Sequence, residues 1–153
     1  MKKIVRNKKG FTLIELMAVI VILAVVMLLV ANRIGNTSKD AKGRAFYIEL
    51  KAVRKNVEQD CLLNGFVKQS SLEEYVTKGE TSVSFVSYYA NSGVTIRVKA
   101  EGSKFKNINI PPELGNGTDK DNNFEADSTS TSTIPNYKFT IANCRYENDK
   151  KSN

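Results

Sequence analysis

One uninterrupted apolar segment near the N-terminus constrains the fold of this chain more than any other feature. Every residue from Leu16 to Ala31 is apolar, and within Phe11–Ala31 the only polar residues are Thr12 and Glu15. As a helix, these 21 residues span about 31 Å, which matches the roughly 30 Å hydrocarbon core of a bilayer. The sequence therefore predicts a membrane-spanning helix that contains a single carboxylate.

The position of this carboxylate demands a physical explanation. An ionised side chain in a membrane segment costs on the order of 2.5 kcal/mol or more at the helix centre, and less near the headgroups. If the chain is cut between Gly10 and Phe11, the new α-amine of Phe11 lies four residues from Glu15. The same amine on a neighbouring copy can then pair with Glu15 in lipid. Such a pair would drive assembly and set its register.

These N-terminal residues resemble those of type IV pilins and pseudopilins. The matching stretch is Lys8-Lys9-Gly10-Phe11-Thr12-Leu13-Ile14-Glu15-Leu16, followed by the apolar run. In that family a membrane aspartyl peptidase cuts after the residue matching Gly10 and N-methylates the residue matching Phe11. The residue matching Glu15 takes part in subunit assembly. The resemblance implies the same roles here, and the missing side chain of Gly10 suits a tight peptidase site.

Two simpler explanations account for less of the segment. A secretory signal needs small residues at its cleavage site, whereas Leu29-Val30-Ala31 places a bulky leucine there. A plain uncleaved signal anchor explains the basic leader and the apolar length, but it leaves Glu15 without a purpose.

Many pilin-like relatives also have a helix-breaking glycine or proline in the apolar half. Here the first candidates, Gly35 and Gly43, come after it.

The 153 residues of the chain leave room for one small domain beside the membrane helix. Five of the 23 basic side chains lie in the leader, which leaves 18 basic against 16 acidic side chains. The basic leader is expected to stay in the cytoplasm while the C-terminal part crosses the membrane. The predicted divisions are a leader that is removed (1–10), a transmembrane or filament-core helix (11–31), its amphipathic continuation (32–64), a globular domain (65–147) with a variable loop (113–133), and a tail (148–153).

The predicted fold class is α+β. One helix is expected from Phe11 to about Leu63, because the apolar run becomes amphipathic without a strong breaker. Its second half should bury two stripes against the domain, namely Ile34, Ala41, Ala45, Ile48 and Ala52, and beside them Phe46, Leu50, Val53, Val57 and Cys61. A short helix is expected from Ser71 to about Gly79. A small antiparallel sheet follows from four predicted strands, Thr81–Ala90, Val94–Glu101, Lys104–Ile110 and Tyr137–Tyr146.

The residues argue against catalysis. The chain has no histidine and two cysteines, Cys61 and Cys144, which removes the usual zinc sets and the Ser-His-Asp and Cys-His arrangements. On the exported side the two cysteines are expected to form one disulfide that joins the end of the long helix to the last strand. The alternative is two small buried apolar side chains.

No cofactor is expected, except that one loop offers candidate ligands for a calcium ion. Oxygen-bearing side chains alternate along this loop, as calcium ligands do. The helix-loop-helix pattern is incomplete, because Phe124 stands where glycine is needed and Ser130 where a bidentate acid is needed. A merely solvated acidic loop is the other interpretation. The candidate ligands are Asp119, Asp121, Asn123, Glu125 and Asp127.

Three functions remain open at this point. The sequence favours a type IV pilin, a structural subunit that polymerises into a surface pilus for adhesion or motility. The second is a pseudopilin of a protein-secretion or DNA-uptake machine, or a minor pilin, and the third is a membrane-tethered binding domain that never polymerises. The expected partners are further copies in a helical filament, prepilin peptidase, the membrane and the pilus-assembly platform, with nucleic acid only for a competence pseudopilin. Before assembly the chain is expected in the cytoplasmic membrane with its domain outside, and afterwards in the pilus at the cell surface.

Overall fold

The computed structural model describes residues 10–89, 93–114 and 123–150, apart from the side chains of residues 32 and 86–89. The chain divides into two compact units, Met1–Thr37 and Ser38–Asn153. One helix, α1 (Leu13–Asn64), contributes its first part to one unit and the remainder to the other. Its bounds confirm the predicted long helix to within two residues at each end.

The described part of the first unit is the apolar part of α1. Its large apolar side chains are exposed in the single chain, from Phe11 at 84% to Val30 at 45%. Among the described residues, α1 is the one helix that is long and apolar enough to cross a membrane. Within its own unit, this exposed apolar helix surface is typical of a helix that a membrane or other helices cover.

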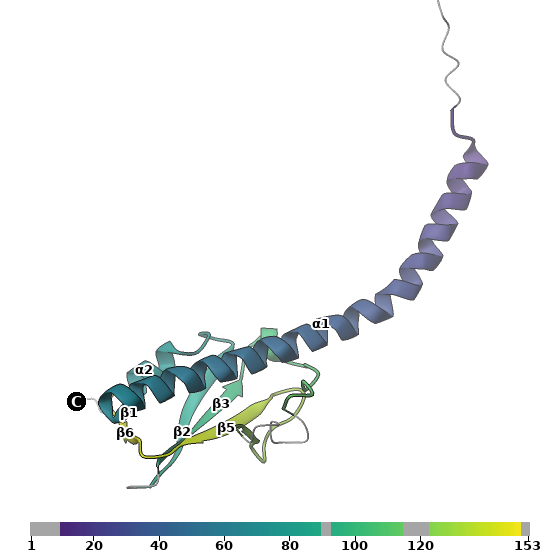
Figure 1. Ribbon diagram of the computed structural model, residues 1–153. Helices are drawn as coiled ribbons and strands as arrows, with labels where there is room; N and C mark the ends of the chain where they lie inside the picture. Colours follow the sequence, from purple (N-terminus) through teal and green to yellow (C-terminus); the bar gives the residue numbers. More distant parts are fainter. Residues whose placement is uncertain (1–9, 90–92, 115–122, 151–153) are drawn as a thin grey trace, which may run out of the picture. The chain divides into compact units, whose positions relative to one another are not determined.

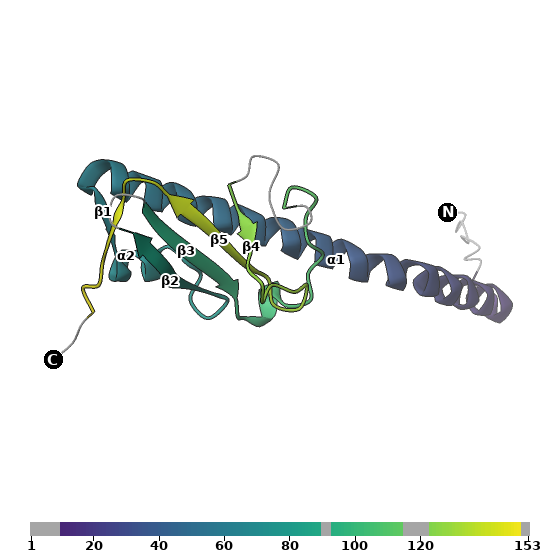
Figure 2. The ribbon, with the colours of Figure 1, turned by 90° about the horizontal axis from the view of Figure 1, so that it is seen from below.

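The second unit is a four-stranded antiparallel sheet against the remainder of α1, as Figures 1 and 2 show. The strand order is β2-β3-β5-β4. The strands are β2 (Thr81–Tyr89), β3 (Gly93–Ala100), β4 (Glu125–Ala126) and β5 (Asn136–Ile141). Long helix and antiparallel sheet together confirm the α+β class.

The core lies between α1 and the inner face of this sheet. Apolar side chains three or four residues apart along α1 share one face, and alternate residues of β3 and β5 share the opposing face. Phe46 is fully buried and its ring lies 6.2 Å from that of Tyr137. The other central contributors are Leu50, Val53 and Val57 from α1, Val94, Ile96 and Val98 from β3, and Phe139 from β5.

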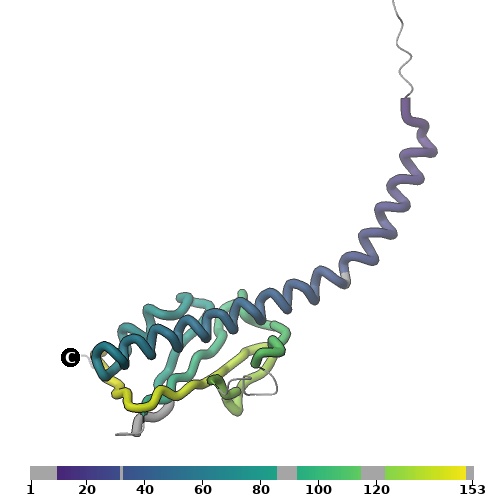
Figure 3. Tube along the Cα trace, in the orientation of Figure 1, coloured from purple at the N-terminus to yellow at the C-terminus, as the bar shows by residue number. Residues whose placement is uncertain are grey.

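The end of α1 carries a smaller substructure. Gly65 ends the helix with a φ of 75°, and its N–H donates to the Cys61 carbonyl over 2.9 Å. Strand β1 (Phe66–Lys68) then pairs in parallel with β6 (Arg145–Glu147), and α2 (Gln69–Glu74) follows β1. In Figure 3 the C-terminal segment accordingly returns to the distal end of the helix. Neither β1 nor the short strand β4 is among the strands predicted from the sequence.

One of the two predicted stripes on α1 is not buried. Phe46, Leu50, Val53 and Val57 are buried and Cys61 is half-buried, as expected. Ile34 and Ile48 are 62% and 66% exposed, and Ala41 and Ala52 are exposed as well. The prediction was wrong for this stripe because it lies across the helix from the core, where the small sheet does not reach. Ala45, at its margin, is half-buried.

Three smaller predictions need correction. Lys104–Ile110 is not a strand, since it holds the end of a single 3-10 turn, Ser103–Phe105, whose Phe105 is buried. The segment Tyr137–Tyr146 is interrupted by a turn between β5 and β6, where Asn143 has a φ of 56°. The short helix starts at Gln69 rather than Ser71 and ends at Glu74, and Ser71 does not cap it.

The variable loop and the tail are anchored to the domain at the residues that the structure describes. Leu114 and Phe124 are buried in the core, which anchors both sides of the loop. In the tail, the Asp149 carboxylate accepts hydrogen bonds from the backbone N–H and the hydroxyl of Ser70 at the start of α2. Lys150 pairs with Glu73. These contacts tie residues 149 and 150 to the domain.

Candidate assembly site

The start of α1 fixes the position of Glu15. Thr12 precedes the first helical residue, and its hydroxyl oxygen accepts the Glu15 N–H over 3.3 Å. In return, Glu15 Oε2 accepts the Thr12 N–H and the Thr12 hydroxyl, each over 2.9 Å. This is a reciprocal capping box, which satisfies N–H groups that a helix terminus otherwise leaves without partners.

The capping box leaves half of the carboxylate open. Both internal bonds end on Oε2, whereas Oε1 has no hydrogen-bond partner among the described residues. The side chain is therefore held in one place with an acceptor directed away from its own helix terminus. The signal for this arrangement was the spacing of Thr12 and Glu15, which the sequence analysis did not use.

The neighbouring residues are accessible. Phe11 is 84% exposed, and Gly10 is exposed with no atom within 4 Å of the place where a side chain would begin. The basic leader, including Lys8 and Lys9, lies outside the described residues. A peptidase that approached the Gly10–Phe11 bond would meet no obstruction from the described part of the chain.

A family profile identifies the motif formed by these N-terminal residues. The profile of the prokaryotic N-terminal methylation motif matches residues 5–31. This chain carries the type IV pilin and pseudopilin signature. The matched residues include Gly10, Phe11, Thr12, Glu15 and the apolar run, which confirms the resemblance described above. Comparisons with curated proteins and with solved structures gave no match.

The pilin signature has direct consequences for the class of protein. It indicates a type IV pilin-like or pseudopilin precursor, a structural and non-enzymatic kind of protein. It implies processing by prepilin peptidase and assembly in a pilus or secretion system. Together with the long apolar helix, it fits anchoring in the membrane followed by assembly. The globular unit lies entirely outside the matched range.

The two cysteines come together in this globular unit. Cys61, one turn before the end of α1, and Cys144, between β5 and β6, form a disulfide with a Cα–Cα distance of 5.3 Å. This distance falls within the usual range for such bridges. The bond links residues 83 positions apart and joins the helix end to the turn that precedes β6, whereas the predicted partner of the helix end was the last strand.

The described residues of the candidate calcium loop make several contacts within the fold. Asp127 is buried, pairs with Arg97 over 2.7 Å and accepts hydrogen bonds from the N–H and hydroxyl of Thr129. The pKa of the Asp127 carboxyl lies below its usual value, first because the Thr129 N–H donates to it and also because the Arg97 guanidinium lies beside it. Glu125 pairs with Lys138 over 3.3 Å.

No metal cluster is found among the described residues. No group of three or more histidine, cysteine, aspartate or glutamate side chains in the described ranges is arranged to hold an ion. Asn123 lies beside α1, where its backbone oxygen accepts a hydrogen bond from Arg54. Asp119 and Asp121 lie outside the described residues. For that part of the loop, calcium binding stays a prediction.

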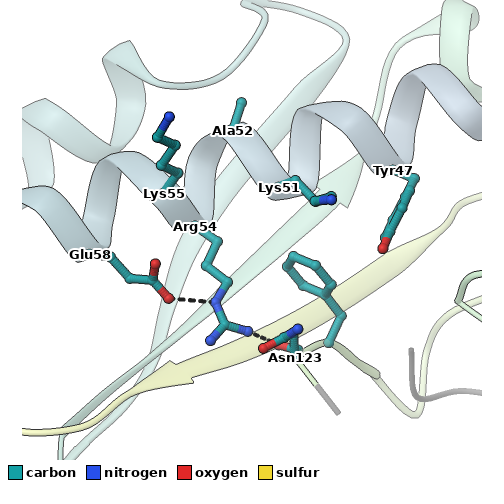
Figure 4. A pocket seen from close by; sticks show the side chains of 8 residues that line it. Tyr47, Lys51, Ala52, Arg54, Lys55, Glu58 and Asn123 are labelled. Carbon is teal, nitrogen blue, oxygen red and sulfur yellow. Dashed lines mark hydrogen bonds and ion pairs between the residues drawn. The ribbon is translucent and has the colours of Figure 1, made fainter. Parts of the chain in front are cut away.

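A hollow of about 570 Å³ lies beside the middle of the amphipathic part of α1. Figure 4 shows Arg54 at its edge, where the guanidinium donates to Glu58 over 2.7 Å and to the Asn123 oxygen over 3.0 Å. Lys51 lies over the Tyr47 ring. These contacts tie the residues that follow the variable loop to the helix, and they do not assemble a nucleophile with a base.

Proposed function

We propose that this chain is the structural subunit of a type IV pilus. Prepilin peptidase cuts between Gly10 and Phe11 and methylates the Phe11 amine, and the processed chain then polymerises through α1. The fibre serves adhesion or motility at the cell surface. The observation that carries the proposal is Glu15, positioned by Thr12 with one carboxylate oxygen open, at the start of an apolar helix that its own chain leaves uncovered.

This geometry supports a mechanism for recruiting one subunit to another. A carboxylate near the membrane boundary gains most from a cation that also satisfies its free oxygen. The Phe11 amine of a neighbouring copy is such a cation after cleavage, and it still carries one positive charge after a single methylation. Thr12 keeps its own amide N–H after cleavage, so the capping box remains while the intermolecular pair forms.

The apolar surface of α1 would supply most of the assembly energy. Side chains from Phe11 to Val30 are exposed in the single chain, and each Å² of apolar surface removed from water contributes about 25 cal/mol. In lipid, close packing replaces this term, aided by small residues such as Ala18 and Ala24. The exposed stripe of Ile34, Ala41, Ile48 and Ala52 extends the contact surface towards the domain.

Replacement of Glu15 tests the proposal. Glu15→Gln keeps the shape of the side chain and removes its charge, and Glu15→Asp keeps the charge as a matched control. We expect Glu15→Gln to insert and to be cleaved like the parent, while its amount in fibres sheared from cells falls about tenfold or more, as loss of a partly buried ion pair implies. Parental fibre yield from Glu15→Gln would contradict charge-driven recruitment.

The same shear experiment separates a pilin from a pseudopilin. Abundant protein in the sheared fraction supports the pilin. Its absence from that fraction, together with a defect in secretion or DNA uptake when the chain is deleted, would assign it to a pseudopilin machine.

A further inference from the structure

Strand β2 lies at one margin of the four-stranded sheet, as Figure 2 shows, and among the described residues no strand pairs with its other edge. The Glu80 carbonyl accepts a hydrogen bond from the residue that follows β3, whereas the Thr81 N–H turns the other way and donates to the Thr77 carbonyl over 3.0 Å. In an antiparallel pair, residues two apart direct their backbone groups to the same side. Val83 and Phe85 therefore direct their N–H and C=O groups away from β3.

This edge of β2 is open to a further strand. Within the described ranges, Val83 and Phe85 form no backbone hydrogen bond with any element other than β3. Proteins often block an exposed edge with a β-bulge, but here the irregularity comes only between Phe85 and Ser87. The regular part from Thr81 to Phe85 is about 14 Å long. Such an edge can pair with an extended peptide through main-chain hydrogen bonds.

A hollow of about 460 Å³ lies beside the start of this edge. Thr81, Ser82 and Val83 of β2 form part of its lining, and the other lining residues come from the end of α2 and the turn that follows it. Its volume falls within the range of ligand-binding sites. The open strand edge thus borders a space that an extended segment can enter.

The walls of this hollow are held in place by α1. The Glu49 carboxylate accepts hydrogen bonds from the Thr77 N–H, over 3.0 Å, and from the Thr81 hydroxyl. These bonds fix the turn after α2 and the start of β2 to the same side chain. Because the hollow is formed before anything binds, a ligand has less ordering to offset.

The lining favours a segment with a basic and an apolar side chain. Lys150 of the chain's own tail pairs with Glu73, so the α2 side of the hollow already accommodates an ammonium group. The next residue, Glu74, is exposed and forms no ion pair within the described ranges. Val76 and Val83 are half-buried and give the hollow an apolar side.

We propose that this hollow and the edge of β2 bind an extended segment of another protein, in which a lysine or arginine lies next to an apolar residue. The backbone of the segment pairs with Val83 and Phe85. Its apolar side chain contacts Val76, and its cation pairs with Glu74. A second copy of β2 fits this site less well, since Thr81–Tyr89 contains no basic residue. The site lies within the globular unit and does not depend on polymerisation.

A labelled peptide, acetyl-Thr-Val-Lys-Val-Thr-amide, tests the site on the full chain in detergent. Fluorescence anisotropy should show saturable binding that empty micelles do not give. Two further peptides carry N-methyl groups on one or the other alternate set of backbone nitrogens. The set that faces β2 should weaken binding about tenfold, since each lost hydrogen bond contributes about 1 kcal/mol or more. Equal affinity of all three peptides, or no saturable binding by the folded chain, would overturn strand addition.

A charge reversal tests the predicted specificity. Glu74→Lys should weaken binding of the lysine peptide by about threefold or more and should favour the analogue with glutamate in place of lysine. Glu147→Lys is the matched control, because Glu147 is exposed on β6 and does not line the hollow. Equal effects of the two reversals would overturn the role of Glu74.

Hydrogen exchange at single amides locates the contact. The lysine peptide should slow exchange at Val83 and Phe85, whose N–H groups face the open edge, more than at Ser84. If exchange at these two amides instead slows as the concentration of the chain rises without peptide, a second copy occupies the edge and the proposed partner is wrong. Neither result depends on fibres, so failure of this proposal leaves the test of Glu15 unaffected.

Discussion

Gly43 lies where α1 and the loop before Pro111 come close together. A Cβ at this position would lie 2.1 Å from the backbone oxygen of Asn109, whereas one at Gly35 meets nothing within 4 Å. The sequence had marked both glycines only as candidate helix breakers. The structure gives Gly43 a packing role inside a continuous helix.

Gly43→Ala should therefore destabilise the protein although alanine favours helices. Overpacking of this kind costs typically about 1–3 kcal/mol, while Gly35→Ala should be neutral or stabilising by up to about 1 kcal/mol. The free energies of unfolding of the two variants in detergent would show the difference. Equal stability of the two variants would mean that the close approach at Asn109 is absent in solution.

Asp127 makes stability depend on acid. Because its folded pKa is lowered, the unfolded state binds more protons in acid, and the stability that the carboxylate provides is present above about pH 4 and lost as pH falls through the folded pKa. The free energy of unfolding of the parent should thus approach that of Asp127→Asn as pH falls from about 6 to below 4. A constant difference across this range would contradict the Arg97 and Thr129 contacts.

At the scale of elements, the periodicity of apolar residues predicted the helix and strand faces that pack in the core. The spacing of Phe46, Leu50 and Val53 predicted the inner face of α1 correctly, and the predicted strand Val94–Glu101 corresponds to β3. Periodicity failed for Ile34 and Ile48, because an apolar helix face looks the same whether its own sheet or another molecule covers it. Only the size and position of the sheet separate the two cases.

Short elements escaped prediction for a different reason. Strands β1, β4 and β6 have two or three residues each, too few to show a period. β1 exists because the chain returns to it some 80 residues later, and the disulfide beside it holds the two ends together. Contacts between residues so far apart in the chain have no local signal.

The Cys61–Cys144 bond should be a large contributor to this distal substructure. For a loop of 83 residues, the chain-entropy model gives about 4–5 kcal/mol of stabilisation. The double substitution Cys61→Ser/Cys144→Ser should lower the free energy of unfolding by about this amount in detergent. If both thiols of the protein purified from the cell surface react with a thiol reagent before reduction, the bridge is absent there.

At the scale of the whole molecule, the two units show how far sequence can lead. The first unit has a chemical signature, since a peptidase, a methyl group and a neighbouring carboxylate each require particular residues at fixed spacing. The roles of Gly10, Phe11 and Glu15 in cleavage, methylation and assembly could therefore be proposed from the sequence alone. The sheet unit has no such requirement beyond packing on α1, so the sequence of residues 65–147 did not identify a ligand or cargo.

The proposed contact of Glu15 with a neighbouring copy presupposes one covalent event, the creation of a new N-terminus at Phe11. Mass spectrometry of the chain from bacterial membranes and from sheared fibres measures that event directly. The account predicts a chain that begins at Phe11 and carries one added methyl group. An intact chain beginning at Met1 as the sole species would remove the amine that Glu15 requires and would contradict the account.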